Sequence, residues 1–417
     1  VVLVMLYFLI YFQLLLIILL LDLNFMIKKL YIFVLLSLFS ITHNNAQVNL
    51  SVYSEISIVT AGPGEELYEK FGHAAIRIKD SVLNLDLIYN YGVFDFNQPN
   101  FLLNFADGKM YYVLARYDFK YFLSSYKKDK RWLKQQVLNL NKTEKQQLFL
   151  YLENNALIEN ATYPYDPFFN NCASKLKDIT TVILKENVVL NSEKIKDKST
   201  LRELMNQEIT WNTWGNFGIN LITGRILDQE RNQLEYTYLP DYLFKTIKNG
   251  KIKRDHKIIN LVKREDVLLD FDEISTNTSL FNPLAFFTLL ALIVVLITVK
   301  DIKNQKRTKW LDFIIFFFTG IVGLILTYFW FFSSHKTAPD NYNVLWAFLP
   351  NLIVAFIVTK AIAKKWLQKY LIILLVCLTI VPILWILELQ IFPITAIPIL
   401  LLLGIRYLFL FKYAIKT

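Results

Sequence analysis

The chain has 417 residues, of which 54% are hydrophobic, and its mean hydropathy is +0.35. An ordinary soluble domain is less apolar than this. The two Cys, 12 Gly and 11 Pro exclude a disulfide scaffold, a collagen-like chain and a disordered chain. Residues 47–280 contain 30 basic and 30 acidic residues, so the net charge of +10 arises entirely outside them. We therefore expect a membrane, and not nucleic acid, as the partner.

Residues 26–46 have the three parts of a secretory signal peptide. Met26 precedes two lysines, residues 30–41 are apolar, and Ala46 is the small residue before the expected cleavage site. This apolar part is too short to cross a bilayer, which needs about 20 residues. Residues 1–25 form a second apolar run. We interpret it as sequence from upstream of the start at Met26, and an extra apolar helix is the alternative.

Residues 280–417 contain five apolar stretches that are each about long enough to cross a bilayer. The stretches are residues 280–299, 313–332, 343–359, 370–387 and 391–411. Basic residues fill the loops after the first and third stretches and the end of the chain, whereas the other two loops contain a single one, Lys336. Because basic loops stay in the cytoplasm, this pattern places residues 47–279 outside, as a cleaved signal peptide also requires. Helical spans indicate the bacterial inner membrane, with this domain on the periplasmic side.

The outer domain, residues 47–279, has the mixed pattern of an α/β domain. Alternating polar and apolar residues predict strands at residues 48–60, 73–79 and 85–91. Helical turns or helices are predicted at residues 65–71, 143–158 and 172–184. Thr143 is expected to cap the second of these, and a Pro-containing loop precedes the third.

Cys172 stands at the start of a predicted helix, and His73 stands at the start of a predicted strand. A helix N-terminus lowers the pKa of a thiol, and a nearby His takes the thiol proton and later protonates a leaving group. This pattern favours thiol catalysis. The ordinary alternatives are an inert buried thiol and a core histidine. A metal site would lack ligands at the usual spacing, so we expect neither a metal nor another cofactor. Cys377 lies within the fourth apolar stretch, which leaves Cys172 without a disulfide partner.

Several motifs together resemble one known family. They include Gly62-Pro63-Gly64-Glu65-Glu66, Phe71-Gly72-His73-Ala74-Ala75, Tyr89-Asn90-Tyr91-Gly92, Phe169-Asn170-Asn171-Cys172-Ala173, Trp214-Gly215-Asn216-Phe217-Gly218, Tyr238-Leu239-Pro240 and the outer loop from Ser334 to Trp346. The set resembles the Bacteroides-type lipoprotein N-acyltransferase (Lnb) family, formerly known as a Bacteroidetes domain of unknown function. The resemblance covers most of residues 50–245 and the membrane part. It is specific as a set, and no single motif carries it.

The resemblance implies an α+β, circularly permuted papain-like domain outside the cytoplasm, followed by an all-α transmembrane bundle of five helices. NlpC-related amidases and lecithin:retinol acyltransferase share the order of His before Cys. Carried over, Cys172 is the nucleophile and His73 is the base. Asn90 is our candidate for the third, orienting residue, and Asp86 is the alternative. The alternative for both residues is that the polar side chain has no catalytic role and faces solvent or a turn.

The activity implied by the resemblance is acyl transfer in two steps. Cys172 takes a fatty acyl chain from a phospholipid as a thioester, and the α-amine of a diacylglyceryl-Cys lipoprotein then accepts the chain. Backbone N–H groups at Cys172 would bind the oxyanion. A membrane-anchored peptidase or amidase that acts on cell-wall peptides is the alternative activity. A membrane scaffold with an incidental thiol is the non-enzymatic alternative.

Five further residues are candidate substrate contacts. They are Asn171, beside the nucleophile, and His335, Asn341, Asn343 and Trp346 in an outer loop of the membrane part. This loop is expected on the same side as the thiol, where it would hold a lipid headgroup or the lipoprotein. The alternative is an interfacial loop whose Trp346 belongs to the aromatic belt.

A group of aromatic residues and one histidine have interpretations that need no functional role. Aromatic residues between Phe94 and Tyr112 suit an apolar opening toward the membrane, and they would suit a core equally well. His256 is expected to be a solvated surface residue.

Overall fold

The computed structural model describes residues 9–18, 20, 25–31, 48–97, 99–190, 199–255, 257–272, 280–360 and 365–416. It divides into two compact units, Val1–Asn49 and Leu50–Thr417. Within the first unit, residues 9–18 and 25–31 are helical and exposed. Residues 32–46 of the expected signal peptide and His256 lie outside the described residues, so the structure leaves the predictions made for them untested.

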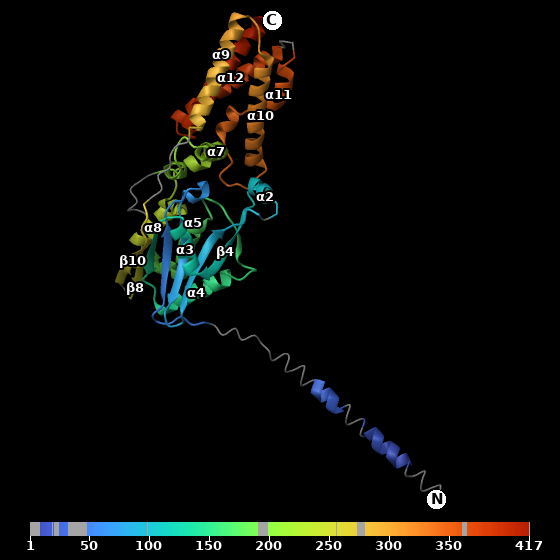
Figure 1. Cartoon of the computed structure of the whole chain (residues 1–417), viewed down its shortest axis with the longest axis vertical. Helices are drawn as coiled ribbons and strands as arrows, with labels where there is room; N and C mark the ends of the chain where they lie inside the picture. Colours follow the sequence, from blue (N-terminus) through green and yellow to red (C-terminus); the bar gives the residue numbers. More distant parts are fainter. Residues whose placement is uncertain are drawn as a thin grey trace. The chain divides into compact units, whose positions relative to one another are not determined.

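The second unit contains a seven-stranded sheet in the order β10-β5-β1-β2-β3-β4-β6, with antiparallel neighbours throughout (Figure 1). Its strands are β1 (Glu55–Ala61), β2 (His73–Asp80), β3 (Leu85–Val93), β4 (Tyr111–Asp118), β5 (Leu133–Leu138), β6 (Thr162–Pro164) and β10 (Val262–Leu269). The strands predicted at residues 73–79 and 85–91 are confirmed. The first strand starts later than predicted because Asp80 holds the preceding turn, accepting hydrogen bonds from the Ser51 N–H at 2.6 Å and the Ser51 hydroxyl at 2.8 Å.

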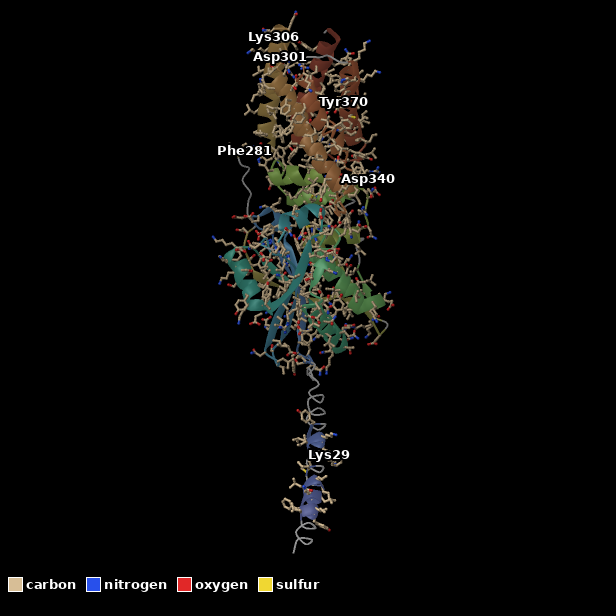
Figure 2. All side chains as sticks on the ribbon, turned by 90° about the vertical axis from the view of Figure 1, so that its right-hand side faces the viewer. Lys29, Phe281, Asp301, Lys306, Asp340 and Tyr370 are labelled. Atoms are coloured by element: carbon tan, nitrogen blue, oxygen red, sulfur yellow. The ribbon has the colours of Figure 1, made fainter. Side chains whose placement is uncertain are left out.

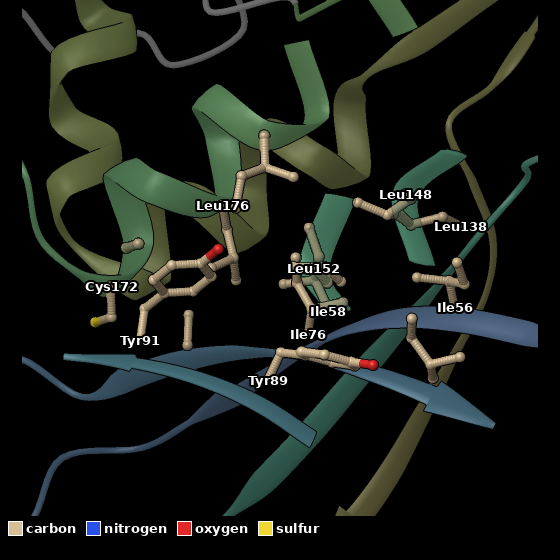
Figure 3. Packing of buried hydrophobic residues seen from close by; sticks show 14 of the residues in the cluster. Ile56, Ile58, Ile76, Tyr89, Tyr91, Leu138, Leu148, Leu152, Cys172 and Leu176 are labelled. Carbon is tan, nitrogen blue, oxygen red and sulfur yellow. The ribbon is translucent and has the colours of Figure 1, made fainter. Parts of the chain in front are cut away.

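The central strands are buried on both faces. One face carries Ile56, Ile58 and Ile76 and packs against Leu148 and Leu152 of α4 (Lys142–Asn155) and Leu176 of α5 (Cys172–Leu184), as Figure 3 shows. The opposite face packs against α3 (Phe119–Lys128) through Phe119 and Phe122. Each fully buried Ile contributes about 1.5–3 kcal/mol to stability. The double cover makes these strands the rigid frame on which the domain is built.

The remaining helices of the outer domain are α2 (Phe101–Asp107), α6 (Leu201–Glu208), α7 (Trp214–Ile222) and α8 (Pro240–Asn249), and a small second sheet joins β7 (Val188–Val189), β8 (Lys251–Arg254) and β9 (Lys257–Asn260). The helix predicted at residues 172–184 is confirmed as α5. The prediction of Thr143 as a cap of α4 was wrong. Asn141 caps this helix, because its side chain accepts from the Glu144 N–H while the Glu144 carboxylate accepts from the Asn141 N–H, both at 2.8 Å.

Four helices among the described residues are long and apolar enough to cross a membrane. They are α9 (Pro283–Lys303), α10 (Lys309–Phe331), α12 (Lys365–Ile386) and the span Ile394–Tyr413, which contains most of α13 (Ile397–Lys416). The structure does not confirm the fifth predicted helix at residues 343–359. That stretch instead forms the short 3-10 turn η5 (Tyr342–Leu345) and the eight-residue helix α11 (Asn351–Val358).

Close packing on α10 explains why irregular backbone is tolerated between η5 and α11. A Cβ at Gly323 of α10 would lie 2.3 Å from the Ala347 carbonyl oxygen, and one at Gly320 would lie 2.2 Å from the Leu352 nitrogen. The glycines therefore let the irregular segment approach α10 directly. Asn351, which is fully buried, donates hydrogen bonds from its side chain to Thr319 and Tyr407. Non-helical backbone at membrane depth is stable only where it is buried in protein in this way.

The ends of the membrane helices divide into two groups. Phe281 and Asp340 lie at one end of the bundle, while Asp301 and Lys306 lie at the other (Figure 2). At the first end, the Trp214 indole N–H donates to the Phe281 carbonyl at 3.0 Å. The outer domain thus contacts the helix ends that the charge pattern places outside, and the basic loop between α9 and α10 lies at the opposite end.

Two more contacts join the outer domain to the first end of the bundle. The Ser334 N–H, just after α10, donates to the Asp107 carbonyl at 2.7 Å. The Ile391 N–H, between α12 and α13, donates to the Asp228 carboxylate at 3.3 Å. Two connections between membrane helices and the segment that enters α9 are therefore bonded to the outer domain at the same end.

A buried ionic cluster joins three membrane helices near the basic loop. The guanidinium of Arg406 on α13, which is fully buried, donates to Asp312 on α10 at 2.7 Å and to Asp301 on α9 at 2.8 Å. It also donates to the Thr298 hydroxyl at 3.1 Å. A charge buried in this way is tolerated only when it is paired. Arg406 pairs with both carboxylates, and the Arg307 guanidinium lies 3.4 Å from the second carboxylate oxygen of Asp312.

We expect the Arg406→Met substitution to destabilise the protein by about 3–5 kcal/mol, because it removes the cationic partner of the buried Asp301 and leaves Asp312 with only the longer contact to Arg307. Thermal unfolding in detergent micelles measures the change. Lys412→Met on the same helix is the control, since Lys412 is exposed and should leave the unfolding midpoint unchanged. Adding Asp312→Asn to the Arg406→Met protein should recover part of the loss. Equal midpoints for the Arg406→Met and wild-type proteins would contradict the proposed role of the cluster.

Candidate active site

The fold brings Cys172 and His73 together from two different elements. Cys172 is the first residue of α5, and Figure 3 shows it where this helix begins over the sheet. His73 is the first residue of β2, against which α5 packs. Asn171 caps α5, accepting a hydrogen bond from the Ser174 N–H at 2.9 Å. The cap sets the direction of the first helical turn, so the thiol is held where β2 begins.

The side chains of Cys172, His73 and Asn90 form one hydrogen-bonded row. The His73 imidazole hydrogen-bonds to the Cys172 thiol. Its Nε2 lies 2.6 Å from the Asn90 Oδ1, and since an amide oxygen only accepts, Nε2 carries the proton. Nδ1 is then the basic nitrogen available to the thiol. The Asn90 amide nitrogen donates to the Tyr117 hydroxyl at 3.1 Å, which fixes the orientation of the amide.

Asp86, the alternative to Asn90, is occupied elsewhere. Both of its carboxylate oxygens accept hydrogen bonds from the Arg77 guanidinium at 2.7 Å. Asp86 lies four residues before Asn90 on β3, where Arg77 of the neighbouring β2 meets it. The geometry therefore places Asn90, and not Asp86, beside the histidine.

Cys172 and His73 each stabilise the charged form of the other. Burial acts to raise the pKa of Cys172, but the charge and hydrogen bond of His73 and the N–H groups of Ala74 and Ala173 lower it below its ordinary value. Burial acts to lower the pKa of His73, but the Cys172 thiolate and the Asn90 hydrogen bond raise it above its ordinary value. Both shifts favour thiolate and imidazolium over the neutral pair, and the thiolate is the reactive form of cysteine.

The positions of Gly92 and Tyr165 beside Cys172 were not predicted from the sequence. Gly92 has a positive φ of 90°, and a Cβ there would lie 3.6 Å from both the Cys172 Cβ and the Tyr165 ring. Tyr165 therefore stands beside the thiol across this glycine. Tyr165 lies in the Pro-containing loop that was predicted before the helix at residues 172–184. Gly92 was the available signal in the sequence. Glycine adopts a positive φ without strain, so a glycine directly after a predicted strand indicates a close approach of the backbone to another segment.

The structure gives four of the predicted substrate contacts an internal role instead. Asn341 donates to the Leu221 carbonyl at 2.7 Å, and Asn343 accepts from the Trp346 indole N–H at 2.8 Å. Asn171 donates to the carbonyls of Pro167 and Tyr238 at 2.8 and 2.7 Å while it caps α5. All four side chains are buried, so the polar loop joins the membrane part to α7 and Trp346 is not part of an exposed aromatic belt.

His335 lies at the outer domain but not beside the thiol. Its Nε2 is 2.7 Å from the Phe105 carbonyl oxygen, and its ring lies between the rings of Phe105 and Phe329. His335 therefore links α2 to the segment that follows α10. Within the described ranges, no three or more His, Cys, Asp or Glu side chains are grouped so as to hold a metal ion.

Two family models match the chain. Residues 43–207 match the Lnb N-terminal periplasmic domain, and residues 275–417 match the Lnb transmembrane domain. The comparisons with curated proteins and with solved structures gave no match. The protein therefore combines a periplasmic domain, built of a sheet and helices, with a transmembrane region of four long apolar helices among the described residues, and it is a multi-pass membrane protein.

The ion pair sets the pH dependence of Cys172 alkylation by iodoacetamide in a Cys377→Ala protein. We expect its midpoint below the ordinary thiol pKa of about 8.5. Asn90→Ala removes a hydrogen bond that raises the pKa of His73, so the imidazolium is lost at lower pH and stabilises the thiolate less. The alkylation midpoint should therefore move upward in Asn90→Ala. Asp86→Asn is the control and should leave it unchanged, and a wild-type midpoint at or above 8.5 would contradict the ion pair.

We expect Asn343→Ala to lower the free energy of unfolding by about 1–3 kcal/mol, because the buried Trp346 N–H loses its acceptor. The alkylation rate of Cys172 should stay at the wild-type value, since the loop has a structural role. Thermal unfolding and alkylation measure the two effects on the same sample. Adding Trp346→Phe removes the orphaned donor and should restore part of the stability. A slower alkylation at unchanged stability would instead indicate a direct role of the loop at the thiol.

Proposed function

The chain belongs to the Lnb family, and from this premise we propose that it is a lipoprotein N-acyltransferase of the bacterial inner membrane. The observation that carries the proposal is the buried Cys172–His73 pair, oriented by Asn90, in a periplasmic domain that is bonded to transmembrane helices. A reactive thiol held at a bilayer suits substrates that are themselves lipids.

In the first step, the Cys172 thiolate attacks the carbonyl carbon of a phospholipid acyl ester. The oxyanion that forms would accept a hydrogen bond from the Cys172 N–H, which stands at the positive end of α5. The imidazolium of His73 then gives its proton from Nδ1 to the departing glycerol oxygen. The products are a lysophospholipid, a thioester on Cys172 and a neutral His73.

In the second step, the free α-amine of a diacylglyceryl-Cys lipoprotein attacks the thioester carbonyl. Neutral His73 takes a proton from the attacking nitrogen, and Cys172 leaves as a thiolate. An amide forms as the thioester breaks, and the thiolate–imidazolium pair is restored. Asn90 acts through His73, since it holds the ring with Nδ1 toward the sulfur in both steps. The reaction as written involves no metal or other cofactor.

The proposed fold is the circularly permuted papain-like arrangement. Two observations support it: the His strand β2 precedes the Cys helix α5 in the chain, and α5 packs with its first residue over an antiparallel sheet. We further propose that the segment from Asn341 to Val358 makes a fifth membrane crossing. Its start bonds to Leu221 of the periplasmic domain, and the Val358 carbonyl at its end accepts from Arg307 in the basic loop.

Peptide hydrolysis is the alternative activity, since a Cys–His–Asn row also suits an amidase. The bonds between the periplasmic domain and the membrane helices favour a membrane substrate, because a cell-wall amidase needs no such attachment to the bilayer.

The test uses the purified protein in phosphatidylethanolamine vesicles with a synthetic diacylglyceryl-Cys lipopeptide. The intact mass of the wild-type protein should increase by one acyl chain, and the lipopeptide should gain that chain as an amide. Cys172→Ala should abolish both changes, and His73→Gln should slow them by about 10²–10⁴-fold, the usual contribution of a general base. Cys377→Ala is the matched control and should behave as wild type. Conversion by the Cys172→Ala protein would overturn the proposal, and peptide cleavage without acyl transfer would favour the amidase.

A further inference from the structure

A continuous row of aromatic rings leads away from the thiol. We call it the aromatic strip, and it comprises Tyr165, Tyr112, Phe94, Phe101 and Phe105. Successive ring centroids are 4.1, 4.8, 6.3 and 6.3 Å apart, and the two planes in each contact lie within 26° of parallel. The first ring stands beside Cys172 across Gly92. The strip therefore begins beside Cys172 and is built from the loop before α5, from β4, from the residue after β3 and from α2.

The far end of the strip lies where α10 ends. Phe105 is on α2, and the last residue of α2, Asp107, accepts hydrogen bonds from the Ser334 N–H at 2.7 Å and from the Tyr328 hydroxyl. Tyr328 belongs to α10, a helix long and apolar enough to cross the membrane. His335 adds a third bond, to the Phe105 carbonyl. The strip thus joins the thiol to the membrane surface of the bundle.

The far end of the strip and the adjoining surface of α2 are more exposed than Tyr112. Tyr112 is 8% exposed, Phe105 is 43% exposed, and Leu103 and Leu102 on the outer side of α2 are 69% and 78% exposed. No residue of α2 is buried. A short helix that presents two leucines and a phenylalanine is unfavourable in water, whereas the same surface is favourable in a lipid leaflet. Its bonds to the end of α10 make this surface continuous with the membrane-spanning surface.

On the basis of the proposed function, we propose that the aromatic strip binds the acyl chain of the phospholipid donor and that α2 enters the outer leaflet through Leu102 and Leu103 to admit that chain. The chain would lie against the partly exposed ring faces, with its ester carbonyl at Cys172. Rigid aromatic rings provide a large apolar surface that loses little conformational entropy when a chain binds.

The first test compares two acyl donors for the wild-type protein and a Leu102→Glu/Leu103→Glu protein. The donors are phosphatidylethanolamine vesicles and a water-soluble short-chain ester, p-nitrophenyl acetate. Thioester formation on Cys172 from vesicles should fall about tenfold or more in the variant, since two leucines no longer enter the leaflet. Acetylation by the soluble ester should stay unchanged. Ile158→Glu is the matched control, because Ile158 is 93% exposed elsewhere in the same domain, and it should keep the wild-type rate with both donors.

Equal rates from vesicles for the variant and wild-type proteins would overturn the inference, as would an equal loss with both donors. A wild-type protein that forms no thioester from vesicles would instead contradict the proposed function, so the two failures are distinguishable.

The second test uses a phospholipid with a photoreactive diazirine at the end of one acyl chain. In the Cys172→Ala protein, where the donor is bound but not cleaved, the label should attach within residues 94–112. Substitution Phe101→Ala with Phe105→Ala should reduce this labelling severalfold, whereas Ile158→Ala in the same protein should leave the labelling unchanged. Labelling confined to the membrane helices would overturn the inference.

Discussion

The buried contact between Cys172 and His73 is the interaction on which the rest of the outer domain depends. A thiolate and an imidazolium stay charged inside a protein only if each stabilises the other and further hydrogen bonds hold both. The helix α5 provides the Ala173 N–H, strand β2 provides the Ala74 N–H, and Asn90 on β3 holds the histidine. Because three elements each supply a part, the pair exists only when the helix is packed on the sheet.

The membrane part meets a related constraint, since no charge or backbone polar group is stable unpaired in hydrocarbon. Arg406 binds two carboxylates near the basic loop, and the irregular backbone before α11 lies directly on the glycines of α10. At the other end, Asn341 and Asn343 bind the carbonyls of α7. The bonds of Asn341 and Asn343 also join the bundle to the periplasmic domain, as the proposed reaction between two lipid substrates requires.

Local patterns predicted well those elements whose residues repeat with a clear period. Strands β2 and β3 follow from alternation, and the start of α5 follows from the Pro-containing loop before an apolar-periodic run. The choice between Asn90 and Asp86 did not follow, because both lie on one face of β3 and only Arg77 on the neighbouring strand distinguishes them. Hydropathy likewise indicated a fifth helix at residues 343–359. It counts apolar residues, and it does not detect that glycines on α10 let the chain approach without forming a long helix.

The sequence by itself indicated the membrane character, and it predicted the side of the membrane for each loop and the two residues proposed as nucleophile and base. These depend on composition, on charge between apolar stretches and on residue type at the start of an element, all of which are local. Only the tertiary structure decided that Asn90 orients His73, that Asn341, Asn343 and Trp346 are buried structural residues, and that Tyr165 stands beside the thiol. Those outcomes depend on which side chains meet across strands and helices far apart in the chain, and the periodicity of one segment carries no information about its neighbours.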